Sequence, residues 1–210
     1  MPKRNKNTYL GNSNTNTSSV TIPAEPIPEK KETRVLNWYT FTFSFLLLSE
    51  IGCDNFLDSK IERSDKSLAL SIIFNLKHSL EIVMKTISYD VSGNNIGEIH
   101  DVQDLIQKLK DKIKKHKNSS KIKSELDKFE KYLVKYCKLE LFNNAFKTSF
   151  TLNDKNNILF KYPESNGKLY VDIDYSTLVN KITKSDIKSI KKDILEIRNI
   201  LNKIKGIIKD

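Results

Sequence analysis

The sequence predicts an all-α protein: a bundle of about five helices with a small β-hairpin inserted before the last one. Two observations support this fold class. Apolar residues recur at helical spacing in five segments, and β-prone runs occur together only around the turn "PESNG". A length of 210 residues is enough for one domain with a substantial core. We therefore expect a disordered polar tail over residues 1–33 and a single helical domain over residues 34–210.

The first predicted helix lies in the most apolar stretch, "RVLNWYTFTFSFLLLSEIG" (34–52). The tail before it is rich in Asn, Ser, Thr and Pro and cannot bury enough apolar surface to offset the entropy of ordering. A membrane span needs about 20 mostly apolar residues. The run from Trp38 to Leu48 is shorter and contains Thr and Ser, which favours a buried helix over a membrane anchor. No secretory signal is visible, so we expect a cytoplasmic protein with no membrane partner.

Two helices joined by a glycine-bearing loop are predicted next. Ser64-Asp65 is a fair N-cap for the second helix. Its apolar stripe consists of Ile72, Leu76, Leu80, Val83 and Ile87. The loop "VSGNNIGEI" follows, because Gly93 and Gly97 supply backbone freedom. Asp101 then caps a third helix. The apolar residues of that helix are Val102, Leu105, Ile106, Leu109 and Ile113.

The later part of the chain predicts a fourth helix, the hairpin and a last helix. The fourth helix is marked by Ile122, Leu126, Phe129, Leu133 and Cys137. The last begins at Thr183 and carries a heptad-like stripe: Ile187, Ile190, Ile194, Ile197, Leu201, Ile204 and Ile208. Leu195, Ile200 and Ile207 broaden this stripe, so we expect the last helix to form a homodimer or to bind a partner protein.

The second helix has a polar edge opposite its apolar one. His78 and Lys85 lie along one stripe, and Lys77, Glu81 and Lys85 form an i, i+4 ladder beside it. Two interpretations are open. Either the ladder lies in solvent and His78 packs half-buried, or His78 and His100 meet in a polar groove across the bundle. In such a groove an imidazole can hold an anion or move a proton.

His100 and Asp101 open the third helix, where free backbone N–H groups and the helix dipole favour an anion. Alternatively, Asp101 only caps the helix and His100 anchors the loop. No cofactor is predicted. Cys53 and Cys137 lie in no spacing typical of zinc ligands, so we predict no metal site and expect reduced thiols.

The charge of the chain favours anionic partners. The net charge is +10, and Lys and Arg exceed Asp and Glu by 13 to 7 over residues 101–150 and by 9 to 4 over residues 176–210. A basic face built from the later helices would suit RNA or a nucleotide. The same basicity is also explained by a skewed amino-acid composition.

Three segments together resemble the HEPN superfamily. "FNLKHSLEIVMKTI" (74–87) is similar to its second helix, and "EIHDVQDLI" (98–106) to the His-Asp start of its third helix. "NNILFKYP" (156–163) is similar to a Phe-Arg-Tyr-Pro element before the last helix, with Lys161 in place of Arg. The resemblance implies an α-helical bundle from prokaryotic defence, toxin–antitoxin or nucleotide-handling systems, commonly paired as two-fold dimers.

Nuclease members of that superfamily carry an Arg followed a few residues later by a His, and none of the four arginines of this chain is followed in that way. The first hypothesis is therefore a non-catalytic module that binds RNA, a nucleotide or a partner protein through His78, Glu81, Lys85, His100, Asp101 and Lys161. The second is a metal-independent ribonuclease with an atypical site, in which His78 and His100 are the candidate catalytic residues. The third is a structural protein that assembles through its last helix.

Overall fold

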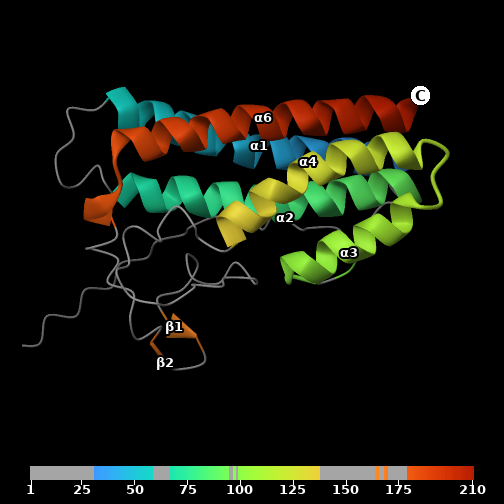
Figure 1. Ribbon diagram of the computed structural model, residues 1–210, viewed down its shortest axis with the longest axis horizontal. Helices are drawn as coiled ribbons and strands as arrows, with labels where there is room; N and C mark the ends of the chain where they lie inside the picture. The colour runs from blue at the N-terminus through green and yellow to red at the C-terminus, as the bar shows by residue number, and fades with distance from the viewer. Residues whose placement is uncertain are drawn as a thin grey trace, which may run out of the picture.

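The computed structural model describes residues 31–58, 67–94, 97, 99–137, 164–165, 168–169 and 179–210. Its helices are α1 (Lys31–Asp58), α2 (Leu68–Ser92), α3 (Val102–Ile113), α4 (Ser119–Cys137) and α6 (Lys184–Lys209). α1, α2 and α6 run along the long axis, α3 packs on α2, and α4 packs mainly on α6 (Figure 1). The prediction of a predominantly helical protein is confirmed for this part of the chain.

The starts of the helices follow the sequence signals to within a turn, but α1 extends to Asp58, six residues beyond the predicted stretch 34–52. α1 begins at Lys31, three residues before the predicted domain start, and the rest of the predicted tail lies outside the described residues. The N-cap of α2 is Ser67, whose side chain makes no capping hydrogen bond, and the predicted cap Ser64-Asp65 is also outside the described part. β1 (Glu164–Ser165) and β2 (Lys168–Leu169) are strands of two residues each and pair in antiparallel orientation. A hairpin with the longer predicted β-prone runs stays a prediction.

α2 is the central helix, because α1, α3, α4 and α6 all pack against it. Its predicted stripe is buried, and from Ser79 to Tyr89 every residue is buried. The interpretation that places the ladder Lys77, Glu81 and Lys85 in solvent is therefore wrong, since all three are buried. An i, i+4 charge ladder is typical of exposed helices, but here it is largely removed from solvent.

Small and polar residues bring α1 close to α2. The hydroxyl groups of Thr42 and Thr86 are 2.8 Å apart and buried. A Cβ added at Gly52 would lie 2.7 Å from the Ile72 side chain, so only glycine permits this approach. Thr42 and Ser49 thus serve the α1–α2 contact, since the Ser49 hydroxyl donates to Ile72 O. Thr40 and Ser44 are exposed and donate to carbonyl groups of α1 itself. Among the described helices, none is long and apolar enough to cross a membrane.

α6 begins where the sequence predicts. Thr183 caps it by accepting a hydrogen bond from the backbone N–H of Asp186, whose carboxylate in turn accepts from the backbone N–H of Thr183. The first six residues of its predicted stripe, from Ile187 to Ile204, are fully buried in the bundle. Ile200, predicted to extend an outer surface, is buried too, whereas Leu195 is 41% exposed. Pairing through α6 stays a prediction, and it now depends on Leu195 and the half-buried Ile207.

Candidate functional site

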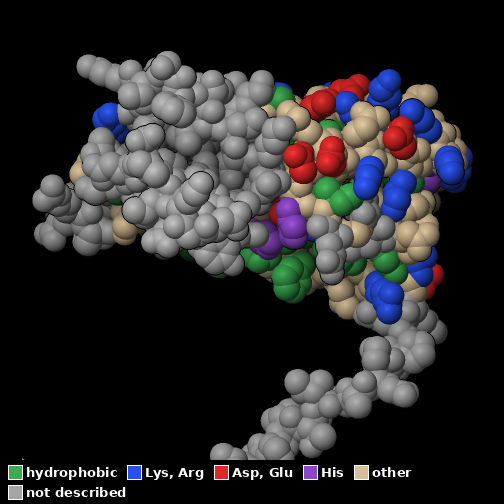
Figure 2. Space-filling view, turned by 90° about the horizontal axis from the view of Figure 1, so that it is seen from below, with side chains coloured by type: hydrophobic (Ala, Val, Ile, Leu, Met, Phe, Trp, Pro, Cys, Tyr) green, Lys and Arg blue, Asp and Glu red, His purple; other side chains and the backbone are tan. Residues whose placement is uncertain are grey.

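A groove of about 650 Å³ lies between the start of α1, the middle of α2 and His100, which is two residues before α3. It is lined by Arg34, Asn37, Trp38, Phe41, His78, Glu81, Ile82, Lys85, Tyr89 and His100. Four of the six residues predicted to bind a ligand are thus brought together. On one face of the molecule, histidine side chains border hydrophobic ones (Figure 2).

Glu81 is the centre of the polar part of the groove. Its Oε1 accepts hydrogen bonds from Lys85 Nζ at 2.8 Å and from His100 Nδ1 at 3.0 Å. The Glu81 side chain is 3% exposed, whereas that of His100 is 55% exposed. An ionised carboxylate can only accept, so Nδ1 of His100 carries a proton. In the neutral ring, Nε2 of His100 is then the basic nitrogen.

The charge on Glu81 is maintained by its partners. Burial acts to raise the pKa of this carboxyl, but the hydrogen bonds and positive charges of Lys85 and His100 together outweigh burial. The pKa of Glu81 therefore lies below its ordinary value. A buried, ionised carboxylate holds one cation and one imidazole in fixed positions beside the groove.

His78 lies in the same groove, in an aromatic setting. Its ring meets Phe45 edge-on, with centroids 4.6 Å apart, and lies nearly parallel to Phe74 at 6.0 Å. Both histidines line this groove, and a direct meeting of the two rings stays a prediction. The two have different surroundings, because His100 is oriented by a carboxylate and His78 by aromatic rings.

The loop between α2 and α3 delivers His100 to the groove. α2 ends at Gly93, which adopts a left-handed conformation with φ of 72° and donates its N–H to Tyr89 O. Asp101 caps α3, and its Oδ1 accepts from the backbone N–H groups of Gln103 and Asp104 at 2.8 and 3.3 Å. The capping interpretation of Asp101 is thereby confirmed. Lys161 lies outside the described residues.

Sequence reasoning did not find the contribution of α1 to the groove. Arg34, Trp38 and Phe41 line it from α1, and Tyr89 lines it from the end of α2. One signal was present: Trp38 is the only tryptophan of the chain, and it stands beside polar Asn37 and charged Arg34 at the start of an otherwise apolar helix.

The groove offers flat rings for stacking, cations for an anion, and an oriented imidazole for proton transfer. Elsewhere in the described ranges, burial followed by the charge of Asp54 raises the pKa of the Cys53 thiol to about 12, which makes it a poor nucleophile. Within those ranges no cluster of three or more His, Cys, Asp or Glu residues could hold a metal ion. No family model, curated protein or solved structure matches this chain.

Proposed function

We propose that the chain is a HEPN-like helical module that binds a nucleotide, or a base of single-stranded RNA, in this groove without cutting it. The observation that carries the proposal is the presence of aromatic and cationic side chains in one groove. Trp38, Phe41 and Tyr89 can stack on a base, which is worth about 1–3 kcal/mol per base in known complexes. Arg34 lies in the same groove, and its guanidinium suits a phosphate.

The polar cluster gives the groove a means of distinguishing ligands. Glu81 holds Lys85 and His100 through two hydrogen bonds, so both donors have defined positions before a ligand arrives. Preorganised polar groups of this kind orient a ligand in a mostly apolar pocket. We expect Lys85 to meet an acceptor atom of the ligand, and Nε2 of His100 to meet a donor or acceptor according to its protonation state.

The HEPN resemblance is consistent with this position of the groove. Segment 74–87 contributes His78, Glu81 and Lys85, and segment 98–106 contributes His100. With the resemblance we propose the rest of the HEPN-like arrangement, including the hairpin before α6, and a place in a prokaryotic defence or toxin–antitoxin system in the cytoplasm. Two of the three resembling segments thus meet at the groove, although they are separated by a loop.

The fluorescence of Trp38 tests nucleotide binding directly, because it is the only tryptophan and lines the groove. We expect ribonucleoside monophosphates to quench it with a saturable profile. Arg34→Gln should weaken this binding about tenfold, since it removes one charge-assisted contact. Lys31→Gln is the matched control, because it removes the same charge one turn earlier, from a side chain that does not line the groove. Fluorescence that does not respond to any of the four nucleotides contradicts the proposal.

The ribonuclease alternative is favoured by one contact, the hydrogen bond of 3.0 Å between Glu81 and His100 Nδ1. A carboxylate that fixes an imidazole tautomer is a common way to prepare a general base. We nevertheless expect no cleavage, because the Arg and His pair of HEPN nucleases is missing. Labelled single-stranded RNA incubated with a metal chelator checks this. Cleavage that is lost in His100→Ala would establish the ribonuclease alternative instead.

A further inference from the structure

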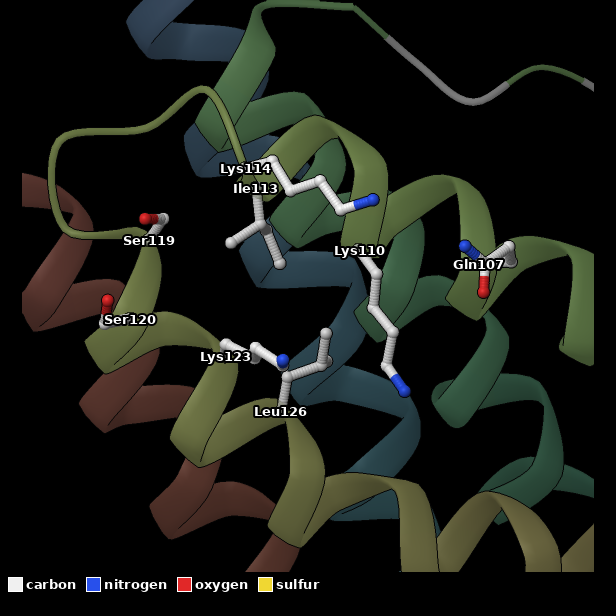
Figure 3. Close-up of a pocket in the computed structure, with 8 residues that line it drawn as sticks. All are labelled: Gln107, Lys110, Ile113, Lys114, Ser119, Ser120, Lys123 and Leu126. Atoms are coloured by element: carbon white, nitrogen blue, oxygen red, sulfur yellow. The ribbon is translucent and has the colours of Figure 1, made fainter.

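A second cavity lies between α3 and α4 and is lined mainly by basic and hydroxyl side chains. Its volume is about 320 Å³. Its lining residues are Gln107, Lys110, Ile113, Lys114, Ser119, Ser120, Lys123 and Leu126 (Figure 3). We call it the lysine cleft. Lys110, Lys114 and Lys123 come from both sides of the turn between α3 and α4. The side chains of Lys110 and Lys123 extend into the gap between the two helices, and that of Lys114 lies along α3 (Figure 3).

The carboxylates near the lysine cleft leave its cations able to accept another anion. Lys110 Nζ donates to Glu130 at 2.6 Å, and Lys114 Nζ donates to Asp111 at 2.7 Å. Both carboxylate side chains are more than one-third exposed. Such exposed ion pairs are weak and are easily exchanged for a more highly charged partner. Lys123, Gln107 and the two serines add further hydrogen-bond donors to the same cavity.

α3 connects the lysine cleft to the groove. His100 precedes α3 at the groove end, whereas Lys110, Ile113 and Lys114 lie at the cleft end. The 12 residues of α3 give a length of about 18 Å at 1.5 Å per residue. Figure 2 shows His side chains on one face of the molecule and, farther toward the end at which Figure 1 places the α3–α4 turn, a group of Lys or Arg side chains. A stacked strand advances about 3.4 Å per nucleotide, so roughly five nucleotides would join the two cavities.

We infer that the lysine cleft binds the phosphate backbone of a nucleic-acid strand whose base occupies the groove. This inference rests on the proposed function and narrows its ligand class from nucleotides to single strands of several nucleotides. Lysine is suited to this role, because its flexible point charge binds phosphate without reading sequence. The groove then selects a base, and the cleft supplies affinity that depends on salt.

The test compares two double variants that lose the same charge. Lys110→Gln/Lys123→Gln removes one lysine of the cleft from α3 and one from α4. Lys108→Gln/Lys121→Gln removes one exposed lysine from each of the same helices outside the cleft. Binding of a labelled single-stranded RNA of about 12 nucleotides, a typical site size, is measured by anisotropy over a range of salt. Binding of a mononucleotide is measured by Trp38 fluorescence, and circular dichroism verifies that each variant folds.

The cleft variant should bind the RNA about tenfold less tightly, and the slope of log affinity against log salt should fall in magnitude by about 1.4, as expected for two lost phosphate contacts. Its mononucleotide affinity and the RNA affinity of the control variant should equal those of the wild type. Equal losses in both double variants would overturn the inference, because binding would then follow overall charge. RNA binding that is unchanged in the cleft variant but lost in Arg34→Gln would overturn it while leaving the groove function intact. RNA bound through the cleft without any response of Trp38 would remove the groove function instead.

Discussion

The groove and the contact between α4 and α6 are built from similar side chains, because in each a carboxylate joins a lysine to a second polar side chain. The two places differ in their surroundings. In the groove, one carboxylate, Glu81, joins Lys85 and His100. Between α4 and α6, Asp193 joins Lys135 and Tyr136, with Oδ2 at 2.5 Å from Nζ and 2.6 Å from the tyrosine hydroxyl. Glu196 joins Lys131 and Tyr132 in the same way one turn along. We call these two clusters the tyrosine seam.

The difference lies in where each carboxylate stands. The tyrosine seam is at the edge of the core: the rings of Tyr132 and Tyr136 are buried, and their hydroxyl groups reach carboxylates at the rim. Such contacts fasten two helices together. Glu81 instead projects from the central helix, where its charge is almost fully removed from water. A buried ion pair contributes little net stability compared with apolar side chains, so the groove cluster does not by itself account for the stability of the fold.

Breaking the groove cluster should have the largest effect on stability. Glu81→Gln leaves the Lys85 charge buried without its carboxylate, which should lower the free energy of unfolding by about 3 kcal/mol. Glu81→Leu/Lys85→Leu removes both charges and should be less destabilised than the single variant. Urea unfolding followed by circular dichroism measures both. A single variant as stable as the wild type would show that Glu81 is solvated and that its surroundings do not differ from those of the seam carboxylates.

Lowering the pH should remove part of the stability that the ionised Glu81 side chain contributes. The pKa of Glu81 is lower in the folded protein than in the unfolded chain, so the unfolded chain binds more protons as the pH falls. The contribution of Glu81 is complete above the ordinary glutamate pKa of 4.5 and is lost as the pH falls through the folded value. The stability difference between wild type and Glu81→Gln should therefore shrink as the pH falls below 4.5. A difference that grows on acidification would contradict the sign.

The tyrosine seam should respond more weakly and without a functional consequence. Tyr136→Phe removes the hydroxyl that donates to Asp193, whose side chain is only 13% exposed, and should cost about 1–2 kcal/mol of unfolding free energy. Tyr132→Phe should cost less, because Glu196 is more exposed. Neither variant should change the nucleotide titration of Trp38. A loss of nucleotide binding in Tyr136→Phe at full helicity would mean that the seam and the groove are coupled.

Apolar periodicity predicted most of the helices because it is a local property. Asp101 was recognisable as a cap and Thr183 as a helix start, since each binds backbone groups two or three residues away. The wall that α1 adds to the groove could not be predicted in this way. Which face of α1 meets the groove depends on its register against α2, and that register is fixed by contacts such as Thr42 with Thr86, 44 residues apart.

The groove itself was predictable only as one of two alternatives. The spacing of His78, Glu81 and Lys85 is equally suited to a solvated edge, and the sequence does not show that α2 has neighbours on every side. The approach of His100 to Glu81 spans 19 residues and a loop, so it depends on how α3 packs against α2. Polar residues on a helix whose apolar stripe is unusually wide are the signal that favours a buried site over a solvated one.

The smallest effect on the fold is expected from the outer surface of α6, which belongs to neither of the compared regions. The apolar stripe of α6 is already buried inside the bundle, so self-association through this helix would depend mainly on the exposed Leu195. Leu195→Lys should change the free energy of unfolding by no more than about 0.5 kcal/mol, as is usual for exposed positions. Light scattering at tens of micromolar should show a dimer for the wild type and a monomer for this variant, because a charge replaces the apolar contact. Lys188→Gln, on the exposed surface of the same helix, is the control and should remain dimeric. A wild-type protein that is strictly monomeric would contradict pairing through α6.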